Sequence, residues 1–237
     1  MNKRVIIFRT CEKAPIHSTR PFGIEKPLLC KICFASIVAP LEREKIAHEI
    51  YVVADEMGDE LAGFYAKKST RIAGFINKKF GNDNSLRECL GIAAGFSGDD
   101  IVYFVEDDYL HHPEWPQVFP FLESCCDNVV VFPPDYLDQY RREDLMIDAK
   151  IVLGPSRHFR RVSSTTFTYL TKARVISLYH AHMLRACTGA DDGLLSQLYR
   201  VLPCFSPLPG LSTHMHEGVM SPFVDWQSIA EGIKEKL

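Results

Sequence analysis

The chain of 237 residues lacks several features that would place a protein in a class at once. It has no apolar run of about 18 residues, the length that a membrane-spanning helix requires. The apolar stretch behind the basic start at 1–4 is too short for a secretion signal, and Arg9 interrupts it. The net charge of −3 provides no overall field that attracts nucleic acid. We therefore expect a cytoplasmic protein without a transmembrane segment, with peripheral membrane contact left open.

The sequence also lacks the cysteine and glycine patterns that would indicate a zinc site or a dinucleotide cofactor. Eight cysteines are scattered, and the one Cys-x-x-Cys, Cys30–Cys33, has no second ligand pair to complete a zinc site. Both thiols lie in an apolar segment, so we interpret them as core residues in a reducing compartment. No Gly-x-Gly-x-x-Gly occurs, which disfavours a dinucleotide oxidoreductase.

What the sequence does contain is an alternation of short β-rich runs and helical stretches. This order is typical of a mainly parallel sheet covered by helices. We expect strands at 5–8, 49–54, 71–75, 101–105 and 129–132, and strand-favouring sequence over 157–175. We expect helices at 24–39 (ended by Pro40), at 85–96 and near 228 (each opened by a Ser-x-x-Glu capping box), after Pro113, and after Asp191. The fold class is therefore α/β, in a single domain.

Three consecutive carboxylates, Glu106-Asp107-Asp108, follow directly on the apolar run 101–105. In open α/β sheets ligands bind beyond the carboxyl ends of the strands, so these side chains point where a substrate would lie. Their mutual repulsion is relieved by a cation, and oxygen ligands suit Mg²⁺ or Mn²⁺. The alternative is a solvated acidic turn that caps the next helix. The buried strand in front favours the metal site, because a cap does not require it.

The run from Val102 to Asp108 resembles the strand and Asp-x-Asp motif of GT-A fold glycosyltransferases, particularly family 2-like bacterial enzymes. Glu106 stands where the motif usually has Asp. The likeness extends along the chain through Arg9-Thr10 after the first strand, Asp55 after the second, the helix start at Asn84 to Arg87, Asp191-Asp192 and His214.

The resemblance implies a GT-A-like (Rossmann-like) sheet in which residues 1–110 bind a nucleotide sugar and residues 111–237 bind the acceptor. It implies an enzyme that moves a sugar from a nucleotide-diphosphate donor, in the first place a UDP-sugar, to a hydroxyl of a glycan, lipid-linked or small-molecule acceptor, with inversion and with Mn²⁺ or Mg²⁺. The residues that it assigns to the donor are Arg9, Thr10, Asp55, Arg87, Glu106 and Asp107. The residues that it assigns to the metal are Asp108, Glu106 and His214.

An inverting transfer also needs a carboxylate that takes the proton of the acceptor hydroxyl. Asp191 and Asp192 open a predicted helix, where Asp is a frequent cap. Either both only cap, or one caps and the other is the base, and the resemblance places the base on Asp192.

Other polar and aromatic groups leave two interpretations open. His214 is either a metal ligand or an exposed loop residue, while His111 and His112 are expected to face solvent or acceptor. The basic cluster of Arg157, Arg160 and Arg161 is either a phosphate site or a solvated strand face. Trp115 and Trp226 either stack on a sugar or pack in the core.

Two other functions compete with glycosyl transfer. A sugar-1-phosphate nucleotidyltransferase would want a glycine-rich loop after the first strand, and residues 9–13 contain no glycine. A non-catalytic carbohydrate-binding protein would keep the sheet without needing both acidic sites. The sequence predicts no oligomeric state.

Overall fold

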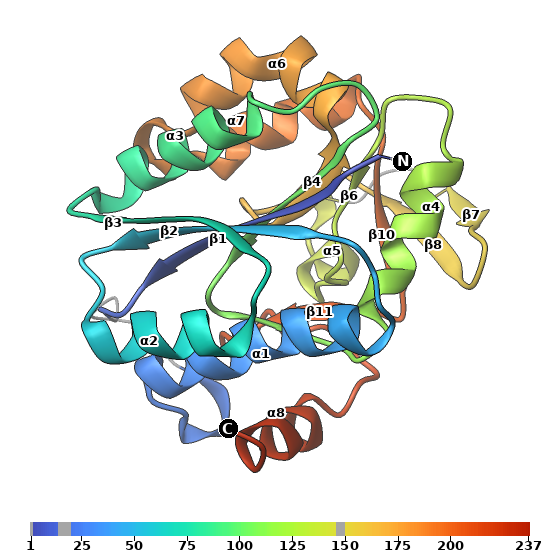
Figure 1. Ribbon diagram of the computed structural model, residues 1–237. Helices are drawn as coiled ribbons and strands as arrows, with labels where there is room; N and C mark the ends of the chain where they lie inside the picture. The colour runs from blue at the N-terminus through green and yellow to red at the C-terminus, as the bar shows by residue number, and fades with distance from the viewer. Residues whose placement is uncertain (1, 14–19, 146–149) are drawn as a thin grey trace.

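The computed structural model describes residues 2–13, 20–145 and 150–237. A nine-stranded sheet runs through it, flanked by helices on both faces (Figure 1). The strands in sheet order are β3 (Ile72–Lys78), β2 (Glu49–Asp55), β1 (Arg4–Cys11), β4 (Ile101–Glu106), β9 (Tyr169–Lys172), β6 (Val130–Val131), β10 (Cys204–Leu208), β8 (His158–Val162) and β7 (Ile151–Leu153). A separate two-stranded ribbon pairs β5 (Tyr109–His111) with β11 (Ser212–His214).

The strand directions confirm the predicted mostly parallel α/β sheet. Strands β1 to β4 run parallel to one another, and β6 runs parallel to β10. Strand β9 joins these two groups and is antiparallel to both β4 and β6, while β8 and β7 extend the sheet antiparallel beyond β10. The carboxyl ends of β1, β2, β4 and β6 consequently open at one edge, where ligands bind in this architecture.

Helices cover both faces of the sheet (Figure 1). One face carries α3 (Gly81–Ala93), α6 (Ala173–Ala186) and α7 (Asp192–Ser196), and the other carries α1 (Lys26–Arg43) and α2 (Asp59–Lys68). Helix α8 (Trp226–Lys234) packs outside α1, and α4 (Val118–Ser124) and α5 (Asp138–Arg141) lie toward the β7 side. Short 3₁₀ turns occupy Pro21–Gly23, Trp115–Gln117, Glu143–Leu145, Thr188–Ala190 and Gln197–Arg200. No helix of the described ranges is long and apolar enough to cross a membrane.

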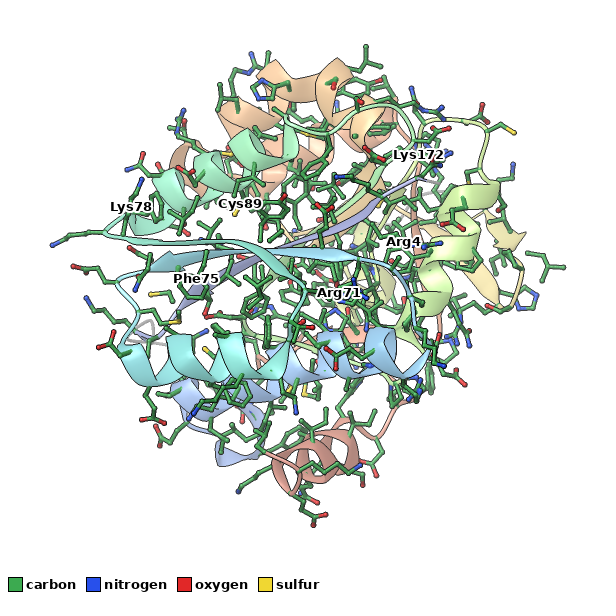
Figure 2. All side chains as sticks on the ribbon, in the orientation of Figure 1. Arg4, Arg71, Phe75, Lys78, Cys89 and Lys172 are labelled. Carbon is green, nitrogen blue, oxygen red and sulfur yellow. The ribbon has the colours of Figure 1, made fainter. Side chains whose placement is uncertain are left out.

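Side chains fill the space between the layers (Figure 2). The run Ile101–Val105 is buried on both faces, as its uniformly apolar sequence predicts. Both tryptophans belong to the core: the indole Nε1 of Trp115 donates to the Ile37 carbonyl at 3.1 Å, and that of Trp226 donates to the Ser221 carbonyl at 2.8 Å. Cys30 and Cys33 are buried free thiols, as expected.

The predicted capping box at Ser85 is wrong, because α3 begins four residues earlier, at Gly81. Ser85 is buried inside the helix, and its hydroxyl donates to the Asn82 carbonyl at 2.7 Å. The carboxylate of Asp55, from the end of β2, accepts from the backbone N–H groups of Phe80 (2.7 Å) and Gly81 (3.1 Å) instead. A cap from a distant strand is invisible to a local motif.

Two further helix boundaries differ from the prediction for similar reasons. Pro40 does not end α1, which continues to Arg43, because burial of Pro40 and Leu41 offsets the backbone hydrogen bond that proline cannot make. The last helix is capped by Asp225, whose carboxylate accepts from the Ser228 N–H at 3.0 Å, and not by Ser228 itself. Helix α6 was not predicted at all, since its first residues lie within the strand-favouring stretch 157–175.

Candidate active site

A polar cleft of about 350 Å³ opens at the carboxyl edge of the sheet. It is built by the ends of β1, β2 and β4, the first turns of α1 and α3, and the segment that follows β11. The residues that line it are Arg9, Thr10, Cys11, Lys13, Arg20, Lys26, Asp55, Asn82, Ser85, Glu106, Asp107, Asp108, His214, Met215 and His216. All three residues of the acidic triplet line this cleft, and that it holds a substrate stays a prediction.

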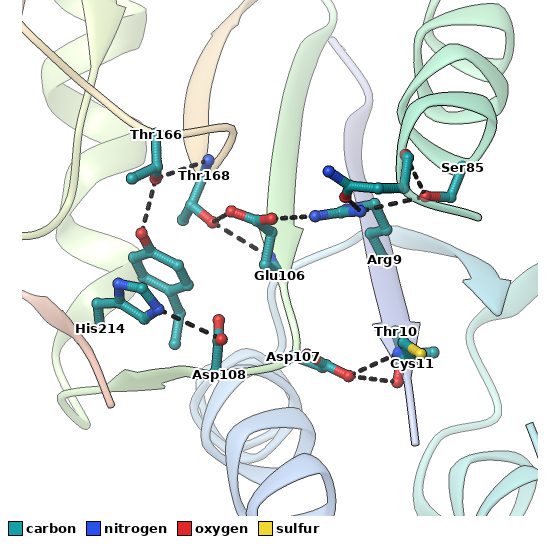
Figure 3. Close-up of polar contacts among 12 residues, drawn as sticks. Arg9, Thr10, Cys11, Ser85, Glu106, Asp107, Asp108, Thr166, Thr168 and His214 are labelled. Carbon is teal, nitrogen blue, oxygen red and sulfur yellow. Dashed lines mark hydrogen bonds and ion pairs between the residues drawn. The ribbon is translucent and has the colours of Figure 1, made fainter. Parts of the chain in front are cut away.

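Each carboxylate of the triplet meets a different cationic side chain. Glu106 forms an ion pair with Arg9, Asp107 with Lys26 and Asp108 with His214 (Figure 3 shows the first and third). The mutual repulsion of the three carboxylates is thus offset largely by groups of the protein.

Glu106 and Arg9 form the wall of the cleft that is nearest α3. The Arg9 guanidinium also donates to the Asn82 side-chain oxygen (2.7 Å) and to the Ser85 hydroxyl (3.1 Å), so it ties β1 to the first turn of α3. On the other side of Glu106, the hydroxyl of Thr168 accepts from the Glu106 N–H at 3.1 Å (Figure 3). Glu106 is therefore held between β1 and the residues before β9.

Asp107 is the most enclosed of the three carboxylates and is 6% exposed. Its Oδ2 atom accepts from the Thr10 hydroxyl (2.9 Å), the Cys11 N–H (2.7 Å) and the Cys30 thiol (3.2 Å). Its Oδ1 atom lies 2.5 Å from the Lys26 ammonium. Burial acts to lower the pKa of Lys26, but the neighbouring carboxylates of Asp107 and Asp108 outweigh it and raise that pKa, so Lys26 carries its positive charge.

Asp108 and His214 lie side by side and are open to the cleft, with side-chain exposures of 33% and 25%. The imidazole Nε2 is 3.2 Å from the Asp108 Oδ2, and the ring stacks on Tyr109 with centroids 4.8 Å apart. Pairing of β11 with β5 sets this position, since His214 is the register partner of Tyr109 and Met215 N–H donates to the Asp108 carbonyl at 2.8 Å. The pKa of His214 is raised: burial acts to lower it, and the Asp108 carboxylate outweighs that effect.

The Asp108–His214 pair fits a divalent cation. Two ligand atoms on adjacent corners of an octahedron, each ~2.1 Å from the ion, are about 3 Å apart. A carboxylate oxygen and an imidazole nitrogen suit Mn²⁺. Within the described ranges no group of three or more His, Cys, Asp or Glu side chains is arranged around one such point. Glu106, the third predicted ligand, forms an ion pair with Arg9 instead. Donor phosphates or water would therefore have to complete the coordination.

The residues predicted to contact the donor fall into two groups. Arg9, Thr10 and Asp55 line the cleft, although one carboxylate oxygen of Asp55 accepts the hydrogen bonds that cap α3. Arg87 does not line it, because the Arg87 guanidinium donates to the Thr188 hydroxyl at 2.5 Å. That the cleft holds a donor stays a prediction.

The predicted catalytic base, Asp192, is not among the residues that line the cleft. Asp191 caps α7 by accepting from the Leu194 N–H at 2.9 Å, which leaves Asp192 exposed, as the division into one cap and one base requires. The turn before them is fixed to α3, since the Gly189 N–H donates to the Asp83 carboxylate at 2.8 Å. Asp192 thus lies beyond the end of α3 that carries Asn82 and Ser85 into the cleft.

Other groups singled out in the sequence are used structurally. His111 is buried, not exposed as expected, because its side chain faces inward from β5 and packs between Tyr103 and Trp115, with its Nε2 2.5 Å from the Tyr103 hydroxyl. The basic residues in and just before β8 form no common patch: buried Arg160 pairs with Asp135 at 2.8 Å, and Arg157 with Glu114 at 3.0 Å.

Lys26 is a cleft residue that sequence reasoning missed. A signal was present, since a cation in the first turn of a helix opposes the helix dipole and is unfavourable without a nearby anion. Asn82, Ser85 and Thr168 carried no comparable signal, because their roles depend on which elements the fold brings together.

Comparison with known proteins identifies the fold. No protein-family model matches the chain, and no curated protein sequence matches it. A crystal structure of the galactosyltransferase LgtC, in complex with donor and acceptor sugar analogs, is similar with a TM-score of 0.57 and 11% identity, over 98% of this chain and 96% of that one. A nucleotidyl transferase from Methanothermobacter is similar with a TM-score of 0.51 and 12% identity, over the whole of both chains. A UDP-glucose pyrophosphorylase from Acinetobacter is similar with a TM-score of 0.51 and 11% identity, over 99% and 92%.

At these identities the likeness concerns the fold alone. The chain has the α/β architecture that GT-A glycosyltransferases and nucleotidyltransferases share. The narrower likeness to family 2-like enzymes stays a prediction.

Proposed function

We propose that the protein is a glycosyltransferase that uses a divalent cation and a nucleotide-diphosphate sugar, with a UDP-sugar as the favoured donor. The observation that carries this proposal is the meeting of Asp108 and His214 at 3.2 Å on the wall of the cleft. They lie more than 100 residues apart in the sequence, and both remain exposed to the cleft. The fold shared with LgtC is consistent with the proposal.

The donor would lie along the carboxyl ends of β1, β2 and β4. Arg9, Lys13 and Lys26 bring positive charge to the cleft and suit a diphosphate. Asp55 and Thr10 lie where the nucleoside part would reach the ends of β2 and β1. Asp108 and His214 would hold Mn²⁺ or Mg²⁺, which when bound offsets the negative charge that develops on the leaving diphosphate.

The transfer itself needs one proton acceptor. The acceptor hydroxyl oxygen forms a bond to the anomeric carbon while the bond from that carbon to the diphosphate oxygen breaks, and the nucleoside diphosphate leaves with the electron pair. We assign the proton of the hydroxyl to Asp192, whose carboxylate is exposed while Asp191 serves as the cap. Attack from the side opposite the leaving group gives inversion.

We also propose a division of labour between the two parts of the chain. Residues 1–110 supply most of the cleft and would bind the donor, and residues 111–237 would bind a glycan, lipid-linked or small-molecule acceptor. The division is not strict, because the donor cleft takes His214, Met215 and His216 from the second part.

A donor screen tests the proposal. The protein is incubated with a panel of nucleotide sugars, Mn²⁺ and mixed acceptors, and released nucleoside diphosphate is measured. Release of a nucleoside diphosphate from one donor, dependent on the metal, is the expected result. Formation of pyrophosphate from a nucleoside triphosphate and a sugar 1-phosphate would identify a nucleotidyltransferase instead. Metal-independent sugar binding without turnover of any donor would identify a binding protein.

A further inference from the structure

The segment 61–82 differs sharply in charge from the rest of the chain. It contains no Asp or Glu, whereas the whole chain has a net charge of −3. Its basic residues are Lys67, Lys68, Arg71, Lys78 and Lys79. Such a run of one sign within an acidic protein indicates a surface that meets an anionic partner.

The fold gathers these cations at one edge of the molecule. Lys67 and Lys68 end α2, and the other three lie along or just beside β3, the outermost strand on this side of the sheet. All except Lys68, which is half-buried, are exposed. Figure 2 shows Arg71 and Lys78 spaced along β3, with Phe75 between them. We call these five cations and Phe75 the basic edge.

The charge of the basic edge is hardly neutralised. Within residues 2–13, 20–145 and 150–237, Lys79 alone of the five forms an ion pair, at 3.8 Å from Glu56. Glu56 lies closer to Lys13, at 2.8 Å. Asp55, the register partner of Lys78, directs a carboxylate oxygen at the backbone N–H groups of Phe80 and Gly81. The excess of positive charge is therefore directed to solvent.

Phe75 distinguishes this surface from an outer strand that is merely protected against pairing with another chain. Lysines on an outer strand often serve only to prevent pairing with another chain. That role does not explain a phenylalanine with 38% exposure in the middle of the strand. Lys and Arg side chains beside an exposed Trp, Phe or Leu are typical of surfaces that bind the interface of an anionic bilayer.

We infer that the basic edge docks the protein on an anionic membrane surface. The end of α2 and the outer strand lie at one side of the molecule, so the cations that they carry can approach a layer of phosphate headgroups. Single-stranded nucleic acid, the other common anionic partner, is held by several stacked aromatic rings, and this edge exposes one.

The basic edge is placed next to the cleft. Lys78, at the carboxyl end of β3, is the register partner of Asp55, which lines the cleft. A bilayer on this edge would therefore lie beside the cleft opening, within reach of an acceptor carried by a lipid. The docking itself does not depend on the proposed transfer reaction, and its test needs no nucleotide sugar.

Vesicle co-sedimentation tests the inference with the full chain. Vesicles of phosphatidylcholine with 30% phosphatidylglycerol are compared with pure phosphatidylcholine, at low salt and at ~0.5 M salt. One variant replaces with glutamine the four basic residues Lys67, Lys68, Arg71 and Lys78. A matched control variant removes the same charge from exposed residues elsewhere, by replacing with glutamine Arg185, Arg200, Lys234 and Lys236.

We expect binding to the anionic vesicles alone, with loss at high salt. Each basic side chain near such a surface strengthens binding roughly fivefold, so the basic-edge variant should bind at least about 100-fold more weakly while the control keeps wild-type affinity. Phe75→Thr should weaken binding more mildly without changing its salt dependence. Absence of binding, equal loss in both variants, or tighter binding to single-stranded DNA than to the vesicles would overturn the inference. Circular dichroism confirms that the variants are folded.

Discussion

The ammonium of Lys26 lies 2.5 Å from the Oδ1 atom of Asp107, and both side chains are buried where β4 ends against α1. The same carboxylate accepts hydrogen bonds from the Thr10 hydroxyl and the Cys11 N–H of β1. The pair thus joins the two central strands to the helix beneath them. It holds Glu106 and Asp108, the neighbours of Asp107, at their places on the cleft wall.

Lys26→Met should destabilise the protein strongly, because it leaves the buried Asp107 carboxylate without its cationic partner. Breaking a buried pair in this way costs about 3–5 kcal/mol in the free energy of unfolding, measured by urea denaturation. Adding Asp107→Asn should recover part of the loss, since the amide carries no charge.

Lys31→Met is the matched control for Lys26→Met. Lys31 belongs to the same helix, and its partner Glu60 is 87% exposed, so this change should cost no more than about 1 kcal/mol. Equal effects of the two lysine substitutions would contradict a special role for the buried pair.

Asp108→Asn should remove the dependence of UDP binding on Mn²⁺, as followed by isothermal titration calorimetry with and without the metal. His214→Gln should weaken Mn²⁺ binding at least roughly tenfold, because even partners outside the coordination sphere typically contribute 10–100-fold. His216 also lines the cleft, but its Nδ1 lies 2.9 Å from the Glu217 carbonyl, so His216→Gln serves as the control. Unchanged metal-dependent UDP binding in Asp108→Asn would refute the metal assignment.

Asp192→Asn should lower turnover by about 10²–10⁴-fold, the usual contribution of a general base, while donor affinity stays the same. Asp191→Ala is the comparison variant: it removes the α7 cap at a cost of ~1 kcal/mol in stability but should leave turnover close to wild type. Full activity of Asp192→Asn would show that another group takes the proton.

His111 should make the protein sensitive to acid. Burial lowers its pKa to about 3 in the folded protein, whereas in the unfolded chain it is ~6.5. Between these two pKa values the unfolded state binds more protons than the folded state. The free energy of unfolding therefore falls as the pH falls, by at most about 1.4 kcal/mol per pH unit between pH ~6 and ~3. Urea denaturation across this range should show a shallower dependence for His111→Gln, and identical slopes would contradict the prediction.

The sheet could be predicted well because its signals are local. The strands β1, β2 and β4 each contain four or five consecutive uncharged, largely apolar residues, and burial on both faces of a parallel sheet requires that composition. Helix boundaries were predicted less well where the decisive partner was remote. Ser85 and Glu88 match a capping box, yet Asp55 from another strand supplies the cap. Nothing in residues 81–88 could reveal this.

The cleft shows the same distinction between local and remote information. The position of Glu106 to Asp108 at a strand end follows from the sequence, and the meeting of Asp108 with His214 agrees with the resemblance to GT-A enzymes. The other partners of the triplet, Arg9 and Lys26, could not be assigned from spacing, because they depend on how β1 and α1 approach β4. The triplet alone suggested three free ligands, whereas among the described residues the fold leaves one of these carboxylates, that of Asp108, without an ion pair to Lys or Arg.

The position of His214 on β11 has a consequence for biosynthesis. By the time a ribosome has joined the first 200 residues, every cleft-lining residue has been made except His214, Met215 and His216. The Asp108–His214 pair can form only when β11 has left the exit tunnel and paired with β5. A nascent chain in which β1, β2 and β4 have already folded would still lack the imidazole, so premature termination before this point leaves out the proposed metal-binding pair.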